Sequence, residues 1–158
     1  MRASLIPPLV ILAAGLLPLC ASGASPAADA GPRNACIEQA AAHYNVHPDL
    51  VRAVIRTEGG TTGKVSWNAN GSYDMGLMQI NSIHLRRLSE FGINRDHVIN
   101  NECVNIYVGS WLLTQAIAQD ADFWRGVGRY HSATPKYNER YRTKVFDHLV
   151  RLWKERSP

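Results

Sequence analysis

The chain has 158 residues, 46% of them hydrophobic, and a formal net charge of +4. This length suits one compact domain with a hydrophobic core of its own. The lysines and arginines are scattered along the chain, and no basic run typical of a nucleic-acid-binding arm is present. Nucleic acid is therefore not an expected partner, whereas the modest positive charge favours anionic polymers and envelope surfaces through screened attraction.

Residues 1–23 have the pattern of a secretory signal peptide. Arg2 precedes an apolar run over residues 5–19, and the small residues "ASGASPAADAG" follow. The run is short and interrupted by prolines, so we expect cleavage near its end and no transmembrane segment in the mature chain. Cys20 leaves a lipoprotein as an alternative, but the bulky Leu19 stands where lipid-attachment sites have a small residue. We therefore expect an exported, periplasmic protein of a Gram-negative envelope.

The rest of the chain divides into a flexible lead-in over residues 24–33, rich in Ala, Ser, Pro and Gly, and one domain over residues 34–158. Periodicity, capping residues and helix-ending glycines predict the helices of this domain. They are expected over residues 35–44, 48–58, 82–91, 102–119, 122–131 and 135–155. A long polar loop covers residues 59–76. Apart from a short ribbon around residues 64–67 no strand pattern is present, so the expected fold class is all-α.

Two cysteines remain once the leader is removed, Cys36 and Cys103. An even pair of cysteines in an oxidising compartment indicates one disulfide, and two separate buried thiols are the alternative. Closing a loop of that length stabilises the folded state by about 4 kcal/mol in the chain-entropy view.

The second expected helix ends on a glutamate that continues its apolar face. Leu50, Val51, Val54 and Ile55 form the apolar stripe, and Glu58 follows at helical spacing. Burial and the negative end of the helix dipole both raise the pKa of this carboxyl, which suits a general acid. The alternative is a structural glutamate satisfied by a buried arginine or by backbone donors.

The residues that follow this glutamate suit contact with a carbohydrate. Gly59 and Gly60 end the helix and leave room for a substrate beside the carboxyl. In "GLMQIN", Gly76 permits close backbone approach, Met78 offers a face for a sugar ring, and Gln79 offers a donor and an acceptor.

Two aromatic segments near the C-terminus add candidates. "GRYHS" presents Tyr130 and His131, and "YNERYRTKV" presents Tyr137 and Tyr141. A tyrosine combines an apolar face with a hydroxyl and so suits a sugar, although half-buried packing is the commoner role.

Together these segments resemble the lytic transglycosylases with a goose-type-lysozyme-like fold, in particular the small exported members associated with conjugation and with type III or type IV secretion systems. The resemblance rests on the Glu58 helix, "GLMQIN", "CVNIYVGSWLL", "RYHS" and "ERYRTKV", and it spans the chain from Cys36 to about Trp153. It implies a single lysozyme-like helical domain with a long loop in the substrate cleft.

The resemblance also implies roles for individual residues. The catalytic acid of the family falls on Glu58, and Cys36 and Cys103 match its cysteine pair. The implied substrate-binding set is Gly76, Met78, Gln79, Asn81, Tyr130, His131 and Tyr141. Many members carry a serine where this chain has Gly59, so the hydrogen bond from that serine must come from elsewhere.

The implied reaction cleaves the β-1,4 bond from N-acetylmuramic acid to N-acetylglucosamine in peptidoglycan and forms a 1,6-anhydro sugar. One carboxyl suffices for it, which departs from the two-carboxylate glycosidases. Asp74 is the nearest second carboxyl, and a turn-forming role for it is the favoured interpretation. The alternatives are a lysozyme-type hydrolase that uses water and a peptidoglycan-binding assembly module without turnover.

No cofactor or metal is expected. His43 and His47 are four residues apart, but His47 precedes Pro48 at a helix start and is expected to cap that helix rather than bind a metal. The glycan strand of peptidoglycan is the expected partner, together with components of an envelope-spanning secretion or conjugation apparatus.

Overall fold

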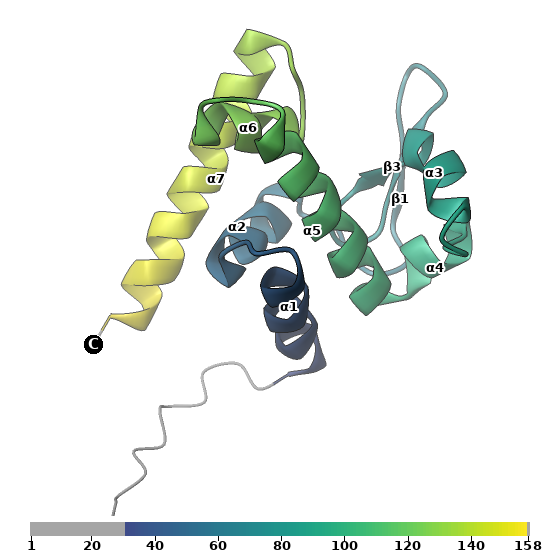
Figure 1. Cartoon of the computed structure of the whole chain (residues 1–158), viewed down its shortest axis with the longest axis horizontal. Coiled ribbons are helices and arrows are strands. Elements are labelled where there is room, and N and C mark those ends of the chain that lie inside the picture. Colours follow the sequence, from purple (N-terminus) through teal and green to yellow (C-terminus); the bar gives the residue numbers. More distant parts are fainter. Residues whose placement is uncertain (1–30, 158) are drawn as a thin grey trace, which may run out of the picture.

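The structure is a computed structural model that describes residues 31–157 (Figure 1). The expected signal peptide and most of the expected lead-in lie outside the described residues. The first helix begins at Pro32 with Gly31 as its N-cap, two residues inside the expected lead-in. Proline at the first helical position is already set to the helical φ, which explains this earlier start.

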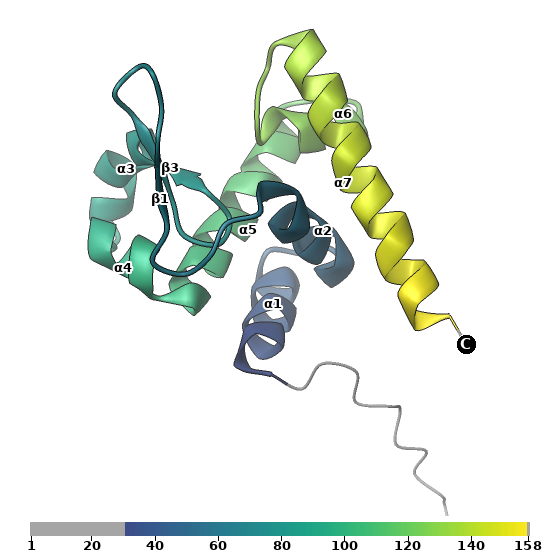
Figure 2. The ribbon, with the colours of Figure 1, turned by 180° about the vertical axis from the view of Figure 1, so that it is seen from behind.

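The described residues form seven α-helices and one small sheet, which confirms the mainly helical fold class. The helices are α1 (Pro32–His43), α2 (Pro48–Glu58), α3 (Leu85–Ser89), α4 (Arg95–Asn100), α5 (Glu102–Ala118), α6 (Phe123–Arg129) and α7 (Pro135–Arg156), and the 3-10 turn η1 (Ser82–His84) precedes α3. The sheet, α3 and α4 lie on one side of α5, and α6 and α7 lie on the other (Figures 1 and 2).

The sheet is larger than the expected ribbon. Its strands are β1 (Val65–Trp67), β2 (Tyr73–Met75) and β3 (Ile80–Asn81), in the antiparallel order β1-β2-β3. Strands of two or three residues are too short to show an alternating pattern in the sequence. The loop expected over residues 59–76 therefore contains two of the three strands.

The helix expected over residues 82–91 is divided, and a further helix was missed. η1 and α3 replace the single helix, and α4 follows after Gly92. At its start the Asn94 side chain accepts a hydrogen bond from the backbone N–H of His97, 2.9 Å away, and His97 bonds back to the Asn94 backbone. This is a capping box formed with histidine in place of the usual acid or amide, so the sequence pattern was easy to overlook.

Antiparallel packing of α2 against α7 joins these helices at both ends. At the N-terminus of α2, the buried Asp49 accepts hydrogen bonds from Trp153 and Arg156 of α7. At the C-terminus of α2, Glu58 accepts a hydrogen bond from Tyr141 of α7. The position of the Glu58 carboxyl is thus set by the same helix pair that forms a large part of the core.

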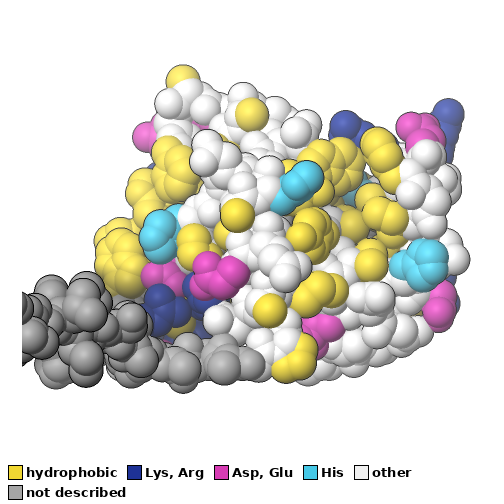
Figure 3. Space-filling view, turned by 60° about the horizontal axis from the view of Figure 1, so that its bottom comes forward, with side chains coloured by type: hydrophobic (Ala, Val, Ile, Leu, Met, Phe, Trp, Pro, Cys, Tyr) yellow, Lys and Arg dark blue, Asp and Glu magenta, His cyan; other side chains and the backbone are white. Residues whose placement is uncertain are grey.

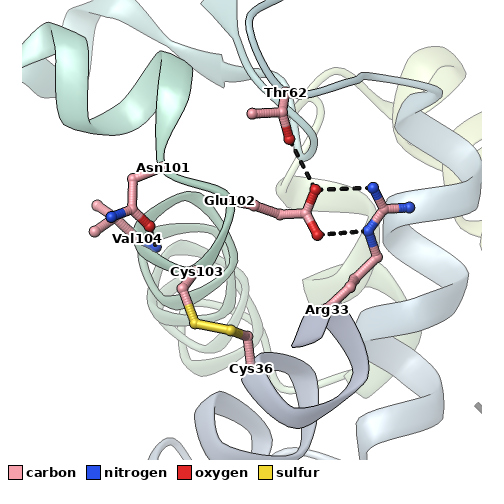
Figure 4. Close-up of a disulfide and its surroundings, with 7 residues drawn as sticks. All are labelled: Arg33, Cys36, Thr62, Asn101, Glu102, Cys103 and Val104. Carbon is pink, nitrogen blue, oxygen red and sulfur yellow. Dashed lines mark hydrogen bonds and ion pairs between the residues drawn. A yellow bond between two sulfur atoms is a disulfide. The ribbon is translucent and has the colours of Figure 1, made fainter. Parts of the chain in front are cut away.

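A disulfide joins α1 to the start of α5, between Cys36 and Cys103, whose Cα atoms are 5.4 Å apart (Figure 4). Beside it, the Glu102 carboxylate accepts two hydrogen bonds from the Arg33 guanidinium, at 2.7 and 2.8 Å, and one from the Thr62 hydroxyl. The structure therefore contains the expected disulfide and not two separate buried thiols.

The surface in Figure 3 carries acidic and basic side chains next to one another, without a broad patch of one sign. Among residues 31–157, no helix combines the length and apolarity needed to cross a membrane.

Candidate active site

The end of α2 places the Glu58 side chain between two pockets. The sheet-side pocket has a volume of about 560 Å³ and is enclosed by β2, β3, α3, α5 and α6. Its lining includes Glu58, Asn68, Asp74, Gln79, Asn81, His84, Arg87, Gln115, Gln119, Arg129, Tyr130 and His131. The α7-side pocket, of about 370 Å³, is lined by Thr57, Glu58, His131, Tyr137, Arg140, Tyr141 and Lys144. Because both pockets share Glu58 and His131, they form one cleft that passes the carboxyl.

The electrostatics of Glu58 favour its protonated form near neutral pH. Burial raises the pKa of Glu58, the hydrogen bond from Tyr141 lowers it and the Asp74 charge raises it, and the net pKa is about 7. The Tyr141 hydroxyl lies 2.6 Å from Glu58 Oε1. Glu58 Oε2 accepts no hydrogen bond from the described residues, so this oxygen remains available to a molecule in the cleft.

Two tyrosines and a histidine form a stack beside the carboxyl. The ring of Tyr141 lies 5.0 Å from that of His131, nearly parallel at 6°, and 6.3 Å from that of Tyr130. The Tyr130 hydroxyl donates to the Met78 carbonyl oxygen, 2.9 Å away. Burial raises the pKa of both tyrosines well above the usual value, so both hydroxyls remain protonated donors. The structure thus brings three expected residues of two neighbouring segments to Glu58, which is distant from them in the chain.

Gln79 lies in the cleft with part of its amide already engaged. Its Nε2 donates to the Gly76 carbonyl oxygen and its Oε1 accepts from the Ser66 hydroxyl, each at 2.8 Å. One N–H and one lone pair remain for a ligand. Its φ of 50° is in the left-handed region, which a non-glycine residue adopts at a cost that is common at functional sites.

Two of the expected substrate-binding residues pack against the interior in this geometry. Met78 is fully buried and its side chain packs against Gly109 of α5, so it presents no face to a sugar. Another group does approach the Gly76 backbone closely, but that group is the Asn105 side chain, which would lie 2.3 Å from a Cβ at this position. Asn105, which the sequence did not single out, holds this segment from inside through the Met78 N–H and the Met75 carbonyl.

The glycines after Glu58 have different roles. A Cβ on Gly59 would meet nothing within 4 Å, so this position does leave space beside the carboxyl. A Cβ on Gly60 would lie 2.2 Å from the Gly76 carbonyl oxygen, so the space expected there for a substrate is filled by the backbone of residues 76–77. Gly60 lets the sheet segment pack on the end of α2.

Asp74 is anchored by side chains and not by the neighbouring backbone that was expected. Asn81 Nδ2 lies 2.7 Å from one of its oxygens and Asn68 Nδ2 lies 3.0 Å from the other. Asn81 also caps η1 by accepting from the Ile83 N–H. With both oxygens engaged, Asp74 is held in place as a fixed charge.

Several polar residues of the cleft were not anticipated. They are His84, Arg87, Gln115, Gln119 and Arg129. Gln115 on α5 and Gln119, the C-cap residue of that helix, are four positions apart, a signal that helical spacing alone could have offered. Burial and the nearby Arg87 lower the pKa of His84.

The described residues contain no cluster of three or more His, Cys, Asp or Glu side chains suited to a metal ion. His47 accepts a hydrogen bond from the Asp49 backbone N–H at the start of α2, which confirms that it caps this helix.

The sequence profile of the transglycosylase SLT domain matches residues 35–145. The chain belongs to this transglycosylase family. Among its relatives, invasion protein IagB of Salmonella typhi is 33% identical over 122 residues, which cover 74% of this chain and 76% of the relative. Protein IpgF of Shigella flexneri is 31% identical over 119 residues, covering 75% and 78%. The X polypeptide of Escherichia coli K12 is 32% identical over 109 residues, covering 66% and 64%.

The matched region of this transglycosylase begins in α1, ends in α7 and includes every cleft residue described above. The family expected from the motifs is therefore confirmed, and the protein is a peptidoglycan lytic transglycosylase.

Proposed function

We propose that this transglycosylase cleaves the N-acetylmuramic acid–N-acetylglucosamine bond with Glu58 as its only protein acid and base, and releases a 1,6-anhydro product. The observation that carries the proposal is the asymmetry of the two cleft carboxyls. Glu58 has a pKa of about 7 and one oxygen open to the cleft, whereas amides hold both oxygens of Asp74. One group is ready to exchange a proton, and the other serves as a fixed charge.

In the first step, protonated Glu58 gives its proton to the bridging oxygen and the bond from C1 to that oxygen breaks. The carbonyl oxygen of the sugar's own N-acetyl group stabilises the positive charge at C1. The Tyr141 hydroxyl, 2.6 Å from Oε1, orients the carboxyl and stabilises the carboxylate left behind.

In the second step, the C6 hydroxyl oxygen of the same sugar attacks C1, and its proton returns to Glu58. The new C1–O6 bond closes the anhydro ring, and no water is consumed. Gln79 retains one N–H and one lone pair to position the sugar, and the Tyr130–Tyr141–His131 stack supports the carboxyl on its other side.

The open space at Gly59 has a place in this proposal. Many other members have a serine directly after the acid, but here the hydrogen bond to the carboxyl from the described residues comes from Tyr141. We infer that Tyr141 supplies the orienting hydrogen bond that such a serine gives elsewhere.

The enzyme acts, in our proposal, in the periplasm, where it opens the wall locally for a secretion or conjugation apparatus. The leader-like N-terminus, the disulfide and the similarity to a protein named for invasion support this placement.

Mass spectrometry of soluble products from purified sacculi tests the chemistry. We expect muropeptides that end in 1,6-anhydro-N-acetylmuramic acid, which are lighter by one water than hydrolase products. Glu58→Gln, which removes the transferable proton with little change of shape, should lower turnover by about 10⁴-fold. The matched control Asp74→Asn should retain most of the activity at its own pH optimum.

Products that carry a reducing end would instead support a hydrolase. An equally inactive but folded Asp74→Asn variant would contradict the one-carboxyl mechanism, and the absence of any clearing by wild-type enzyme in a cell-wall gel would leave the binding-module alternative.

A further inference from the structure

Two arginines on the walls of the sheet-side pocket lack a full set of partners. Arg87, in the middle of α3, places its guanidinium 4.3 Å from the centroid of the Trp111 ring, and this guanidinium forms no hydrogen bond or ion pair with the described residues. Stacking on an aromatic face holds the guanidinium plane while its N–H edge remains free to bind an acceptor.

Arg129, whose side chain is 33% exposed, shows a similar deficit at one buried atom. Its Nε is buried and has no hydrogen-bond partner. The nearest carboxylate oxygen, on Asp120, lies 3.9 Å from its Nη1, and that carboxylate is already bound by Arg125 at 3.0 Å. A buried N–H without an acceptor is costly and rare, and the exposed part of the same side chain lines the pocket, so the guanidinium has donors left for an acceptor there.

The other groups of this wall fit an anionic ligand as well. Gln115 of α5 and Gln119, the C-cap residue of that helix, line the same pocket and can donate amide N–H groups. Sugar hydroxyls are neutral and do not require two guanidinium groups, whereas a carboxylate pairs with guanidinium through two parallel hydrogen bonds. Such carboxylates are carried by the acidic peptide stems attached to the muramic acid residues of peptidoglycan.

We propose that Arg87 and Arg129 bind the carboxylates of the peptide stem, and that this transglycosylase thereby selects glycan strands that carry acidic stems. This inference rests on the proposed function, since it assigns a substrate feature to the same cleft. Arg140 and Lys144 in the α7-side pocket are the competing cations. Both are exposed, as Arg87 is, but neither stacks on an aromatic ring as Arg87 does or has a buried donor without a partner as Arg129 does.

The test compares two forms of one substrate: sacculi with intact stems, and the same sacculi after an amidase has removed the peptides. The amidase removes the peptide carboxylates and frees the lactyl carboxylate of each muramic acid, which is an amide in the intact strand. The stripped strand therefore carries one carboxylate close to the sugar ring, and only the intact strand carries those of the peptide. KM and kcat are measured for wild type, Arg87→Gln, Arg129→Gln and Arg129→Lys. Arg86→Gln is the matched control, because Arg86 is adjacent and exposed but does not line the pocket.

We expect each glutamine variant to raise KM on stem-bearing sacculi roughly tenfold, with kcat within about twofold of wild type, and to leave KM on stripped glycan unchanged. Arg129→Lys should lose less than Arg129→Gln because lysine keeps the positive charge. It should not match wild type because it lacks the two parallel N–H donors of a guanidinium. Equal increases on both substrates, no increase, or an increase found only in an Arg140→Gln/Lys144→Gln variant would overturn the proposal.

A binding measurement separates this inference from the proposed reaction. NMR titration of a disaccharide-peptide, and of the same disaccharide without its peptide, is carried out on wild type and on Arg87→Gln/Arg129→Gln. Failure of wild type to turn over either substrate refutes the proposed reaction, whereas peptide-dependent binding that the double variant loses still supports the stem site. Equal affinity of wild type for the two sugars refutes the stem site.

Discussion

At Glu58, neighbouring groups act on one carboxyl in opposite directions. Burial and the Asp74 charge raise its pKa, and the Tyr141 hydroxyl lowers it. The balance, about 7, lies close to neutral pH, where a group that must both give and take a proton is most effective. Each neighbour can be removed separately without removing the acid itself.

The two neighbours give a pH prediction with opposite signs. Tyr141→Phe removes the lowering hydrogen bond, so the alkaline limb of kcat/KM should move to higher pH. Asp74→Asn removes the raising charge, so the same limb should move to lower pH, since activity requires protonated Glu58. Clearing of sacculi recorded from pH 4 to pH 9 measures both limbs, and shifts in the same direction would contradict this assignment.

The raised pKa of Glu58 also has a cost in stability. The free chain has the ordinary pKa of 4.5 and the folded state a pKa of about 7, so the unfolded state loses its proton first. The free energy of unfolding that the protonated carboxyl contributes is fully present below pH 4.5. It is lost as pH rises to about 7, by roughly 3 kcal/mol in total.

Glu58→Gln removes this titration. Its free energy of unfolding, relative to wild type, should therefore grow between pH 4.5 and pH 7 and then remain constant. Urea denaturation at pH 4, 6 and 8 measures the difference, and a difference independent of pH would show that the carboxyl is not desolvated in the folded protein.

At the scale of elements, α2 and α7 matter most because Glu58 and its partner Tyr141 lie one on each. Their opposite ends are joined through Asp49, which receives hydrogen bonds from Arg52, Trp153 and Arg156. The pKa of Asp49 is lowered: burial acts to raise it, but its partners on α7 outweigh that effect. This buried contact keeps the helices in register and so fixes the geometry at the far end of α2.

Asp49→Asn tests this contact. It leaves two arginines beside a neutral amide, and we expect a loss of about 3 kcal/mol in the free energy of unfolding at pH 7. The matched control is Glu155→Gln, because Glu155 pairs with Arg56 at 2.9 Å on the surface and such exposed pairs contribute little to stability. Similar losses in the two variants, read from urea denaturation, would mean that burial of Asp49 has no special effect.

At the scale of the whole molecule, the Cys36–Cys103 disulfide closes a loop over a sequence separation of 67 residues that contains α2, the sheet, α3 and α4. The loop thus contains Glu58 and most of the sheet side of the cleft, whereas α6 and α7 lie outside it. Neither cysteine lines the two cleft pockets.

Replacing both cysteines with alanine should lower the free energy of unfolding by about 4 kcal/mol while activity at 25 °C remains. Urea denaturation and a clearing assay measure the two effects. Thiol labelling of the denatured, unreduced wild-type protein should detect no free thiol in the described region, and two labelled cysteines would contradict the disulfide.

Much of this protein follows from local sequence. Helical periodicity and capping residues predicted α1, α2, α5, α6 and α7 to within a few residues, because these helices are long or clearly bounded. The apolar stripe ending at Glu58 predicted a buried carboxyl at a helix end, and the raised pKa agrees with it. The family could be assigned because its motifs are contiguous in sequence. Most of the sheet and α4 were not predicted, since strands of two or three residues and a histidine capping box give weak local signals.

Only the tertiary structure decided which side chains face the cleft. Met78 and Gly76 belong to the same motif as Gln79, which lies in a tight turn. The Gln79 side chain lines the cleft, whereas the Met78 side chain and the Gly76 backbone pack against α5. Gly60 serves packing where the sequence indicated open space. Arg87 and Arg129 come from helices 42 positions apart in the chain and meet only because the sheet-side pocket brings α3 and α6 to its walls. The direction in which a side chain points depends on the residues that pack against its backbone, and these residues come from segments far apart in the sequence.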